Sequence, residues 1–286
     1  MPIIGSMEML TTAYKNGYAV PGFDGWDAST CQNVLLTARE KKSPALLICG
    51  TNEYATLGAK TVAAVVQAVS DVQGMPICIH LDHARTYEQV VECIEAGYKS
   101  VMIDGSLGDY EYNVALTKKV VEYAHPKNIP VEAELGTILN VDEITHEKSD
   151  AKKAVYTDPD QAKDFVNRTG CDYLAVSIGN AHGWYPQAPV LDFDTLKNIR
   201  ESVSIPLVLH GGSGTPADQL KKAVSLGISK VNVASEINRS FNAVYIPLMQ
   251  EGKTWWAEAE LAGNLENRKV IAKWMDNLES SGKQNY

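Results

Sequence analysis

Residues 77–83 read Ile-Cys-Ile-His-Leu-Asp-His, a short apolar and β-branched run that ends in Asp82 and His83. Neighbouring side chains of a strand point to opposite faces, so these two can share one site only if the strand ends there and the backbone turns. Two other histidines have the same setting, because His182 follows the apolar run 173–178 and His210 ends the run 206–210. Three histidines at three strand ends predict a metal site at the rim of a barrel.

Short apolar runs and amphipathic helical segments alternate along the chain. Strands are expected at residues 18–21, 45–49, 77–83, 100–105, 131–136, 173–178, 206–210 and 230–234. Most of the runs are continuous in hydrophobicity, as expected of strands buried on both faces of a parallel sheet. Eight such units in roughly 250 residues predict an α/β fold, the (β/α)8 TIM barrel. A doubly wound open sheet would place its functional groups at one switch point and not at six strand ends, so the barrel is preferred.

We expect a single TIM-barrel domain over residues 1–286, with the barrel at about 18–240 and C-terminal helices at about 241–286. An amphipathic helix is expected within the first 17 residues. The C-terminal extension carries Trp255, Trp256 and Trp274, which are expected to pack against the barrel or a second subunit.

The composition limits the classes of partner. A net charge of −9 argues against nucleic acid or an anionic membrane as the main partner, because both need a basic face. An anionic small molecule remains compatible, since a metal ion and backbone N–H groups can make a locally positive pocket. No apolar run reaches the ~18 residues of a membrane span.

The cysteines indicate a reducing compartment. The five are scattered, odd in number and without a Cys-x-x-Cys pair, so we expect free thiols and a cytoplasmic protein. No lysine or arginine precedes Lys15, which argues against an ordinary signal peptide.

Polar side chains gather at the expected carboxyl ends of the strands, where the active sites of TIM barrels lie. His83, His182 and His210, with one open position, describe a catalytic Zn²⁺ site. Asp104 and Glu134 are expected either to orient these ligands by hydrogen bonding or to offer an alternate metal position.

The other histidines have different settings. His80 lies inside its strand and is expected to be a hydrogen-bonded neighbour of the site. His125 is placed at the opposite end of the barrel and His146 in the polar stretch 137–154, so neither is a candidate ligand.

Glycine-rich turns predict an anion site beside the metal. Gly183 follows His182, and Gly211, Gly212 and Ser213 follow His210. Asn232 and Ser235 end the eighth strand. Phosphate pockets in barrels often form from the loops after strands 7 and 8 with the N-terminus of a helix, where glycine lets backbone N–H groups come close.

The chain resembles the class II, metal-dependent ketose-bisphosphate aldolases, a family that includes fructose- and tagatose-1,6-bisphosphate aldolases. The resemblance runs in order from about Met7 to Ser240 and rests on the motifs at residues 80–83, 131–136, 181–183, 209–214 and 232–235.

The resemblance implies a cofactor, a substrate pocket and an assembly. Zn²⁺, or another divalent metal, would be held by the three histidines with Asp104 and Glu134 near it. A dihydroxyacetone-phosphate pocket would be built from Gly183, Gly211, Ser213, Asn232 and Ser235. A monovalent cation (Na⁺ or K⁺) often lies beside that phosphate in family members, most of which are homodimers or homotetramers.

The implied reaction is reversible aldol cleavage of a ketose phosphate. Asp82 would take the proton of the C4 hydroxyl during cleavage and return it during condensation. In family members a second acid/base comes from the loop after the fifth strand, where Asp142 or Glu143 would fill that place.

The chain departs from the family pattern at the aldehyde end of the site. Acids, Asp24 and Asp27, replace two amides after the first strand, and Asn238 replaces a cation linked with the distal phosphate. Arg239 is one residue further, about 100° round a helix. These changes predict a preference for ketose 1-phosphates or for an unusual ketose bisphosphate.

Two other functions were weighed against the aldolase. A metal-dependent TIM-barrel hydrolase usually has a richer carboxylate site and a His-x-His motif, which this sequence lacks. A non-catalytic barrel subunit that stabilises a partner aldolase would be free to lose its metal ligands, yet all three histidines and Asp82 remain.

Overall fold

The computed structural model describes residues 3–141 and 155–284. Its eight strands are β1 (Val20–Asp24), β2 (Leu46–Gly50), β3 (Cys78–Ala84), β4 (Ser100–Ile103), β5 (Val131–Leu135), β6 (Tyr173–Val176), β7 (Leu207–Leu209) and β8 (Ile228–Val233). Its helices are α1 (Met7–Asn16), α2 (Ala28–Lys41), α3 (Thr51–Leu57), α4 (Ala59–Gln73), α5 (Tyr87–Ala96), α6 (Tyr110–Ala124), η1 (His125–Lys127), α8 (Pro159–Thr169), α9 (Phe193–Ser202), α10 (Ala217–Ser225), α11 (Ser235–Glu251) and α12 (Trp256–Asn277).

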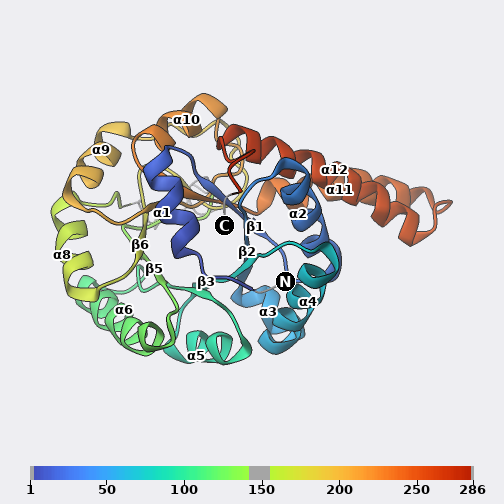
Figure 1. Ribbon diagram of the computed structural model, residues 1–286. Helices are drawn as coiled ribbons and strands as arrows, with labels where there is room; N and C mark the ends of the chain where they lie inside the picture. The colour runs from blue at the N-terminus through green and yellow to red at the C-terminus, as the bar shows by residue number, and fades with distance from the viewer. Residues whose placement is uncertain (1–2, 142–154, 285–286) are drawn as a thin grey trace, which may run out of the picture.

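The strands close into one parallel barrel in chain order, and β8 pairs with β1 (Figure 1). The helices surround the barrel, so every strand is covered on its outer face. Outward-facing residues such as Leu47, Ile79 and Val101 are fully buried against helix residues such as Val34 and Val66. The predicted (β/α)8 barrel is therefore confirmed.

Helix α1 closes the amino-terminal end of the barrel. Its residues Met9 and Leu10 pack with Leu46, Met102 and other inward-facing side chains in a second apolar cluster. The helix begins at Met7 rather than at the chain start and ends where Gly17 adopts a left-handed conformation with φ 69°. The interior below the site is thus a packed core, and access is from the carboxyl ends of the strands.

The C-terminal helices differ in detail from the prediction. Helix α11 starts at Ser235 and runs through residue 240 without a break, so no boundary separates the barrel from an extension at 241. Helix α12 returns alongside it, and the far part of the α11–α12 hairpin projects from the barrel (Figure 1). Trp274 packs against the barrel and donates a hydrogen bond to Glu236, whereas Trp255 and Trp256 are exposed in the single chain.

Helix α3 follows β2 directly and brings Glu53 to the rim of the barrel, as described below. Among the residues that the structure describes, no helix is long and apolar enough to cross a membrane.

Candidate active site

A bulge in β3 brings Asp82 and His83 to the same cavity. The strand continues to Ala84, so the expectation that it ends at His83 is wrong. The register with β4 shifts between Leu81 and Ala84, and His83 adopts φ 49°. A bulge re-aims a side chain, and for a residue other than glycine the left-handed conformation costs about 1–2 kcal/mol. Both side chains therefore reach one site through a locally strained backbone at His83.

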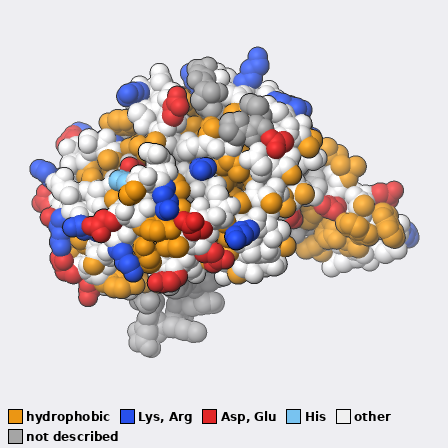
Figure 2. Space-filling model, turned by 60° about the horizontal axis from the view of Figure 1, so that its bottom comes forward, with side chains coloured by type: hydrophobic (Ala, Val, Ile, Leu, Met, Phe, Trp, Pro, Cys, Tyr) orange, Lys and Arg blue, Asp and Glu red, His pale blue; other side chains and the backbone are white. Residues whose placement is uncertain are grey.

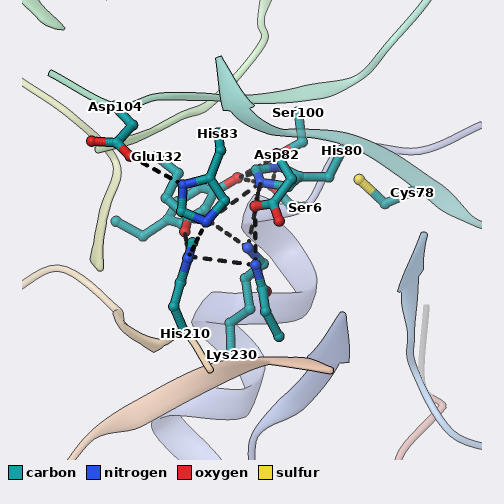
Figure 3. Close-up of polar contacts among 12 residues, drawn as sticks. Ser6, Cys78, His80, Asp82, His83, Ser100, Asp104, Glu132, His210 and Lys230 are labelled. Atoms are coloured by element: carbon teal, nitrogen blue, oxygen red, sulfur yellow. Dashed lines mark hydrogen bonds and ion pairs between the residues drawn. The ribbon is translucent and has the colours of Figure 1, made fainter. Parts of the chain in front are cut away.

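The three strand-end histidines meet at a common point, and Figure 3 shows two of them, His83 and His210, side by side. Nε2 of His83 lies 3.0 Å from Nε2 of His182 and 2.9 Å from Nδ1 of His210, and the last two atoms are 3.4 Å apart. Ligand nitrogens about 2.0–2.1 Å from a tetrahedral Zn²⁺ would be about 3.3–3.4 Å apart. The triangle thus has nearly the size that a zinc ion requires.

On two of the three rings, those of His83 and His210, the other nitrogen faces a carboxylate, which fixes the position of its hydrogen. Nδ1 of His83 lies 3.1 Å from Oδ2 of Asp104, and Nε2 of His210 lies 2.7 Å from Oε1 of Glu132. A carboxylate only accepts, so His83 carries its hydrogen on Nδ1 and His210 on Nε2. When His83 is neutral, its Nε2 and Nδ1 of His210 both present lone pairs to the same point and cannot bond to each other. A cation between them fits this donor set.

Asp104 is held firmly by its neighbours. Arg85 Nη1 lies 2.7 Å from its Oδ2, and the Ser106 hydroxyl donates to its Oδ1 at 2.6 Å. Although burial acts in the opposite sense, the hydrogen bond from His83 and the charges of His83 and Arg85 hold the pKa of Asp104 well below its usual range. Asp104 therefore stays ionised and orients His83, one of the two roles predicted for it.

Glu134 lies beside Asp104 and His83, but its pKa is shifted in the opposite direction from that of Asp104. Burial, followed by the charge of Asp104, raises the pKa of Glu134 to about 8. Its Oε1 accepts a hydrogen bond from Ser106 at 3.0 Å, and its buried Oε2 has no hydrogen-bond partner in the described part of the chain. His83, Asp104 and Glu134 also form a second group of potential ligand atoms within 4.8 Å of one another. The geometry is compatible with the predicted alternate metal position.

Asp82 faces the cavity next to the histidines. Its Oδ1 accepts a hydrogen bond of 3.0 Å from Nδ2 of Asn232, and its side chain is 13% exposed. A carboxylate fixed at one oxygen and open to the cavity is suited to proton transfer.

A cavity of about 380 Å³ collects most of the predicted binding residues. Those that line it are Asp82, His83, His182, Gly183, Gly211, Ser213, Asn232 and Ser235. Ser235 is the first residue of α11, so the N-terminus of that helix opens toward the cavity. The ligand His210 lies buried behind the cavity wall, and Gly212 does not line the cavity either, because its N–H bonds to the Asn232 carbonyl and a side chain there would meet Val231. Gly212 thus fixes the turn after β7 by its hydrogen bond to β8.

Some predicted residues lie outside the described part of the chain. These are Asp142, Glu143 and His146. The segment that leads to them starts at the cavity, since Ile138, Leu139 and Asn140 line it. His125 lies at the opposite end and pairs with Asp172, as expected of a residue without a role in the site.

The structure adds site residues that the sequence did not predict. Glu132 and Lys230 are fully buried inside the barrel, and Glu53 and Arg85 line the cavity, as does Asp24, which was predicted at the aldehyde end of the site. Glu132 and Glu134 are two residues apart, as are Lys230 and Asn232, so the period of a strand was the signal that placed each pair on one face.

Comparisons with known proteins agree with this geometry. A sequence model of the family described as fructose-bisphosphate aldolase class-II matches residues 5–283. The D-tagatose-1,6-bisphosphate aldolase subunit GatY of Klebsiella oxytoca is 44% identical over 242 residues, which cover 85% of this chain and 84% of that protein. The crystal structure of the YdjI aldolase from Escherichia coli K12 has a TM-score of 0.86 at 32% identity and covers 99% of this chain and 100% of that one. A fructose-bisphosphate aldolase from Campylobacter jejuni, 21% identical, has the same fold, with a TM-score of 0.81 and coverage of 98% and 97%.

Gly211→Ala is expected to disrupt the turn after β7. Gly211 has φ 62°, and an added Cβ would lie 1.9 Å from the Ala181 carbonyl oxygen, next to His182. We expect a loss of at least about 3 kcal/mol in the free energy of unfolding, measured in urea, together with weaker metal binding. Gly252→Ala is the matched control, because Gly252 has φ 67° but nothing within 4 Å, and its cost should be only about 1 kcal/mol. Equal losses in the two variants would contradict the proposed clash.

Zinc binding to the metal-free protein is expected to release protons at pH 7. Burial lowers the pKa of His83, but Asp82, Asp104 and Glu134 outweigh it and raise the pKa to about 9. The imidazole is therefore protonated at pH 7, and it must lose that proton to offer Nε2 to the metal. Calorimetry in buffers of different ionisation enthalpy should show release of at least one proton, and affinity should rise as the pH increases toward 9. Zinc binding at pH 7 without proton release would contradict this assignment.

Proposed function

The chain belongs to the class II fructose-bisphosphate aldolase family and is an aldehyde-lyase of carbohydrate metabolism, and on this premise we propose that it cleaves a ketose 1-phosphate to dihydroxyacetone phosphate and an aldehyde. The observation that carries the proposal is the convergence of three imidazole ring nitrogens beside Asp82 and the N-terminus of α11. These features supply a cation site, an acid/base and an anion site in one cavity.

Zn²⁺ is the proposed metal, held by His83, His182 and His210. When bound there, it supplies a Lewis acid that stabilises the negative charge that develops on the substrate as the carbon–carbon bond breaks. Asp82 takes the proton from the C4 hydroxyl in cleavage and returns it in condensation. Asn232 holds Oδ1 of Asp82, so the carboxylate keeps one orientation in both directions.

The proposed phosphate subsite lies between the turns after β6 and β7 and the start of α11. Gly183, Gly211 and Ser213 leave backbone and hydroxyl groups at the cavity wall, and the dipole of α11 favours an anion there. Na⁺ or K⁺ beside this phosphate remains a prediction from the family resemblance.

The cavity wall that follows β1 and β2 is acidic, which supports an aldehyde product without a phosphate. Asp24, at the end of β1, and Glu53, in α3, line it, and Arg85 is the one lysine or arginine among the described lining residues. Arg85 is already paired with Asp104. Burial, then Glu53 and Asp82, raises the pKa of Asp24 to about 8, so at pH 7 this carboxyl can donate a hydrogen bond to a hydroxyl. A second phosphate would meet acids and no free cation in the described part of this wall.

The other departures from the family pattern have structural explanations. Asp27 caps α2 by accepting from the Thr30 backbone and does not line the cavity. Asn238 accepts a hydrogen bond from Asn242, and the Arg239 guanidinium lies 4.3 Å from the centre of the Trp184 ring. Of the two substituted acids, Asp24 is therefore the one that can affect the substrate.

A homodimer or homotetramer is proposed from the family resemblance and is supported by the projecting hairpin. Hydrophobic side chains gather on it (Figure 2), and those more than a third exposed are Ile246, Met249, Trp255, Trp256, Leu261 and Leu265. Apolar patches of this kind usually mark protein contacts.

All five cysteines are free and buried, which is compatible with the proposed cytoplasmic setting.

The substrate proposal predicts a higher kcat/KM for a ketose 1-phosphate than for the matching 1,6-bisphosphate, by at least about tenfold, which corresponds to about 1.4 kcal/mol. At pH 9, above the pKa of about 8, Asp24→Asn should narrow the difference, because it removes a negative charge from the aldehyde side. Asp27→Asn is the matched control and should leave the ratio unchanged. Retro-aldol rates on both substrates measure this, and a strong bisphosphate preference of the unmodified protein would defeat it.

Asp82→Asn is expected to lower kcat about 10²–10⁴-fold, because the amide cannot accept the C4 hydroxyl proton. Zinc content and the melting temperature should change little, since the side chain keeps its size and the three histidines remain. Asp109→Asn, at the N-cap of α6, is a remote control that should retain full activity. If Asp82→Asn kept normal turnover with a full complement of zinc, another group would be the base.

A further inference from the structure

A buried carboxylate connects the proposed metal ligand His210 to a lysine inside the barrel (Figure 3). Oε1 of Glu132 accepts from Nε2 of His210 at 2.7 Å, and Oε2 accepts from Nζ of Lys230 at 2.6 Å. The side chains of all three residues are fully buried. Charged side chains are almost never fully buried unless they are paired, and such a pair is weak evidence for a role in stability.

The hydrogen bonds continue from Lys230 toward the closed end of the barrel. Nζ of Lys230 lies 3.3 Å from Nε2 of His80, and Nδ1 of His80 lies 2.7 Å from the Ser100 hydroxyl. An ammonium group has no acceptor, so Nε2 of His80 must accept and its Nδ1 must carry the hydrogen. Ser100 in turn contacts the hydroxyls of Tyr173 and Ser6, just before α1. Lys230 therefore donates a hydrogen bond on each side, to Glu132 and to His80.

We propose that the Glu132–Lys230 pair is a positioning device that makes His210 bind the metal through Nδ1. Lys230 occupies one oxygen of Glu132 as a donor, which leaves the other oxygen as an obligatory acceptor for His210. His210 must then carry its hydrogen on Nε2, and the lone pair of Nδ1 points at Nε2 of His83, 2.9 Å away. His83 and His182 both face the same point through Nε2, so His210 is the one proposed ligand that uses the other nitrogen.

The inference rests on the proposed zinc site. A positioning role and a purely structural role of the Glu132–Lys230 pair predict different results when both charges are removed. In Glu132→Gln/Lys230→Met, no charge is left unpaired inside the barrel. Replacing a whole buried ion pair is often neutral for stability. The glutamine amide, however, can turn either its oxygen or its NH2 group toward His210. A positioning role therefore predicts lost metal affinity in a protein that remains folded.

The experiment measures zinc dissociation constants by competition with a chelator and the melting temperature of the metal-free protein. The double variant should bind zinc about 10–100-fold more weakly than the unmodified protein, with little change in melting temperature. Glu111→Gln/Arg168→Met removes a surface ion pair as the matched control and should leave zinc affinity unchanged. If the Glu132→Gln/Lys230→Met variant bound zinc as tightly as the unmodified protein does, the inference would be overturned.

A second measurement needs no variant of the site. Loading ¹¹³Cd²⁺ into protein labelled with ¹⁵N-histidine reveals by nitrogen–cadmium coupling which ring nitrogens bind. One of the three bound rings is expected to bind through Nδ1 with a hydrogen on Nε2, and the other two through Nε2. Three rings bound through Nε2 would overturn the inference while leaving the metal site intact. Failure of the unmodified protein to bind either metal would instead defeat the proposed function.

Discussion

The site depends on the direction of the hydrogen bonds that carboxylates accept from imidazoles. A neutral imidazole has one donor and one acceptor nitrogen, so a buried carboxylate at one side determines what the ring offers at the other. Asp104 and Glu132 act in this way on His83 and His210. The rings themselves are brought together by closure of the barrel, but their proton positions are set by these two acids.

Charge balance explains why the acids around the histidines behave differently. Asp104 has Arg85 and His83 beside it and stays ionised, and Glu132 is paired with Lys230. Glu134 is buried, pairs with no cation in the described part of the chain and lies near Asp104, so its pKa rises. The barrel thus holds one carboxylate paired at the rim, one paired in the interior and one that is close to neutral at pH 7.

Much of this arrangement was predictable because parallel strands of a barrel end at one rim. The positions of His182 and His210 followed from apolar runs alone, and so did the glycine-rich turns beside them. The bulge at His83 was not predictable, since a run of seven strand-like residues gives no sign that one of them adopts φ 49°. Lys230 was missed for a different reason: a charge inside an apolar run becomes interpretable only when its partner, Glu132, is known to face it across the barrel.

The polar interior also constrains residues that carry no polar side chain. Strands β3, β5 and β8 each contribute two polar residues spaced by two: His80 and Asp82, Glu132 and Glu134, Lys230 and Asn232. Long side chains in the centre of an eight-stranded barrel need space, because its interior is just wide enough for side chains to fill it. Gly22 on β1 provides that space, since a Cβ there would lie 2.9 Å from Oδ1 of Asn232 and 3.5 Å from Cε of Lys230. A glycine in a strand normally weakens it, so its presence at this position follows from the volume of Asn232 and of Ile48, whose Cγ2 would lie 3.0 Å from that Cβ.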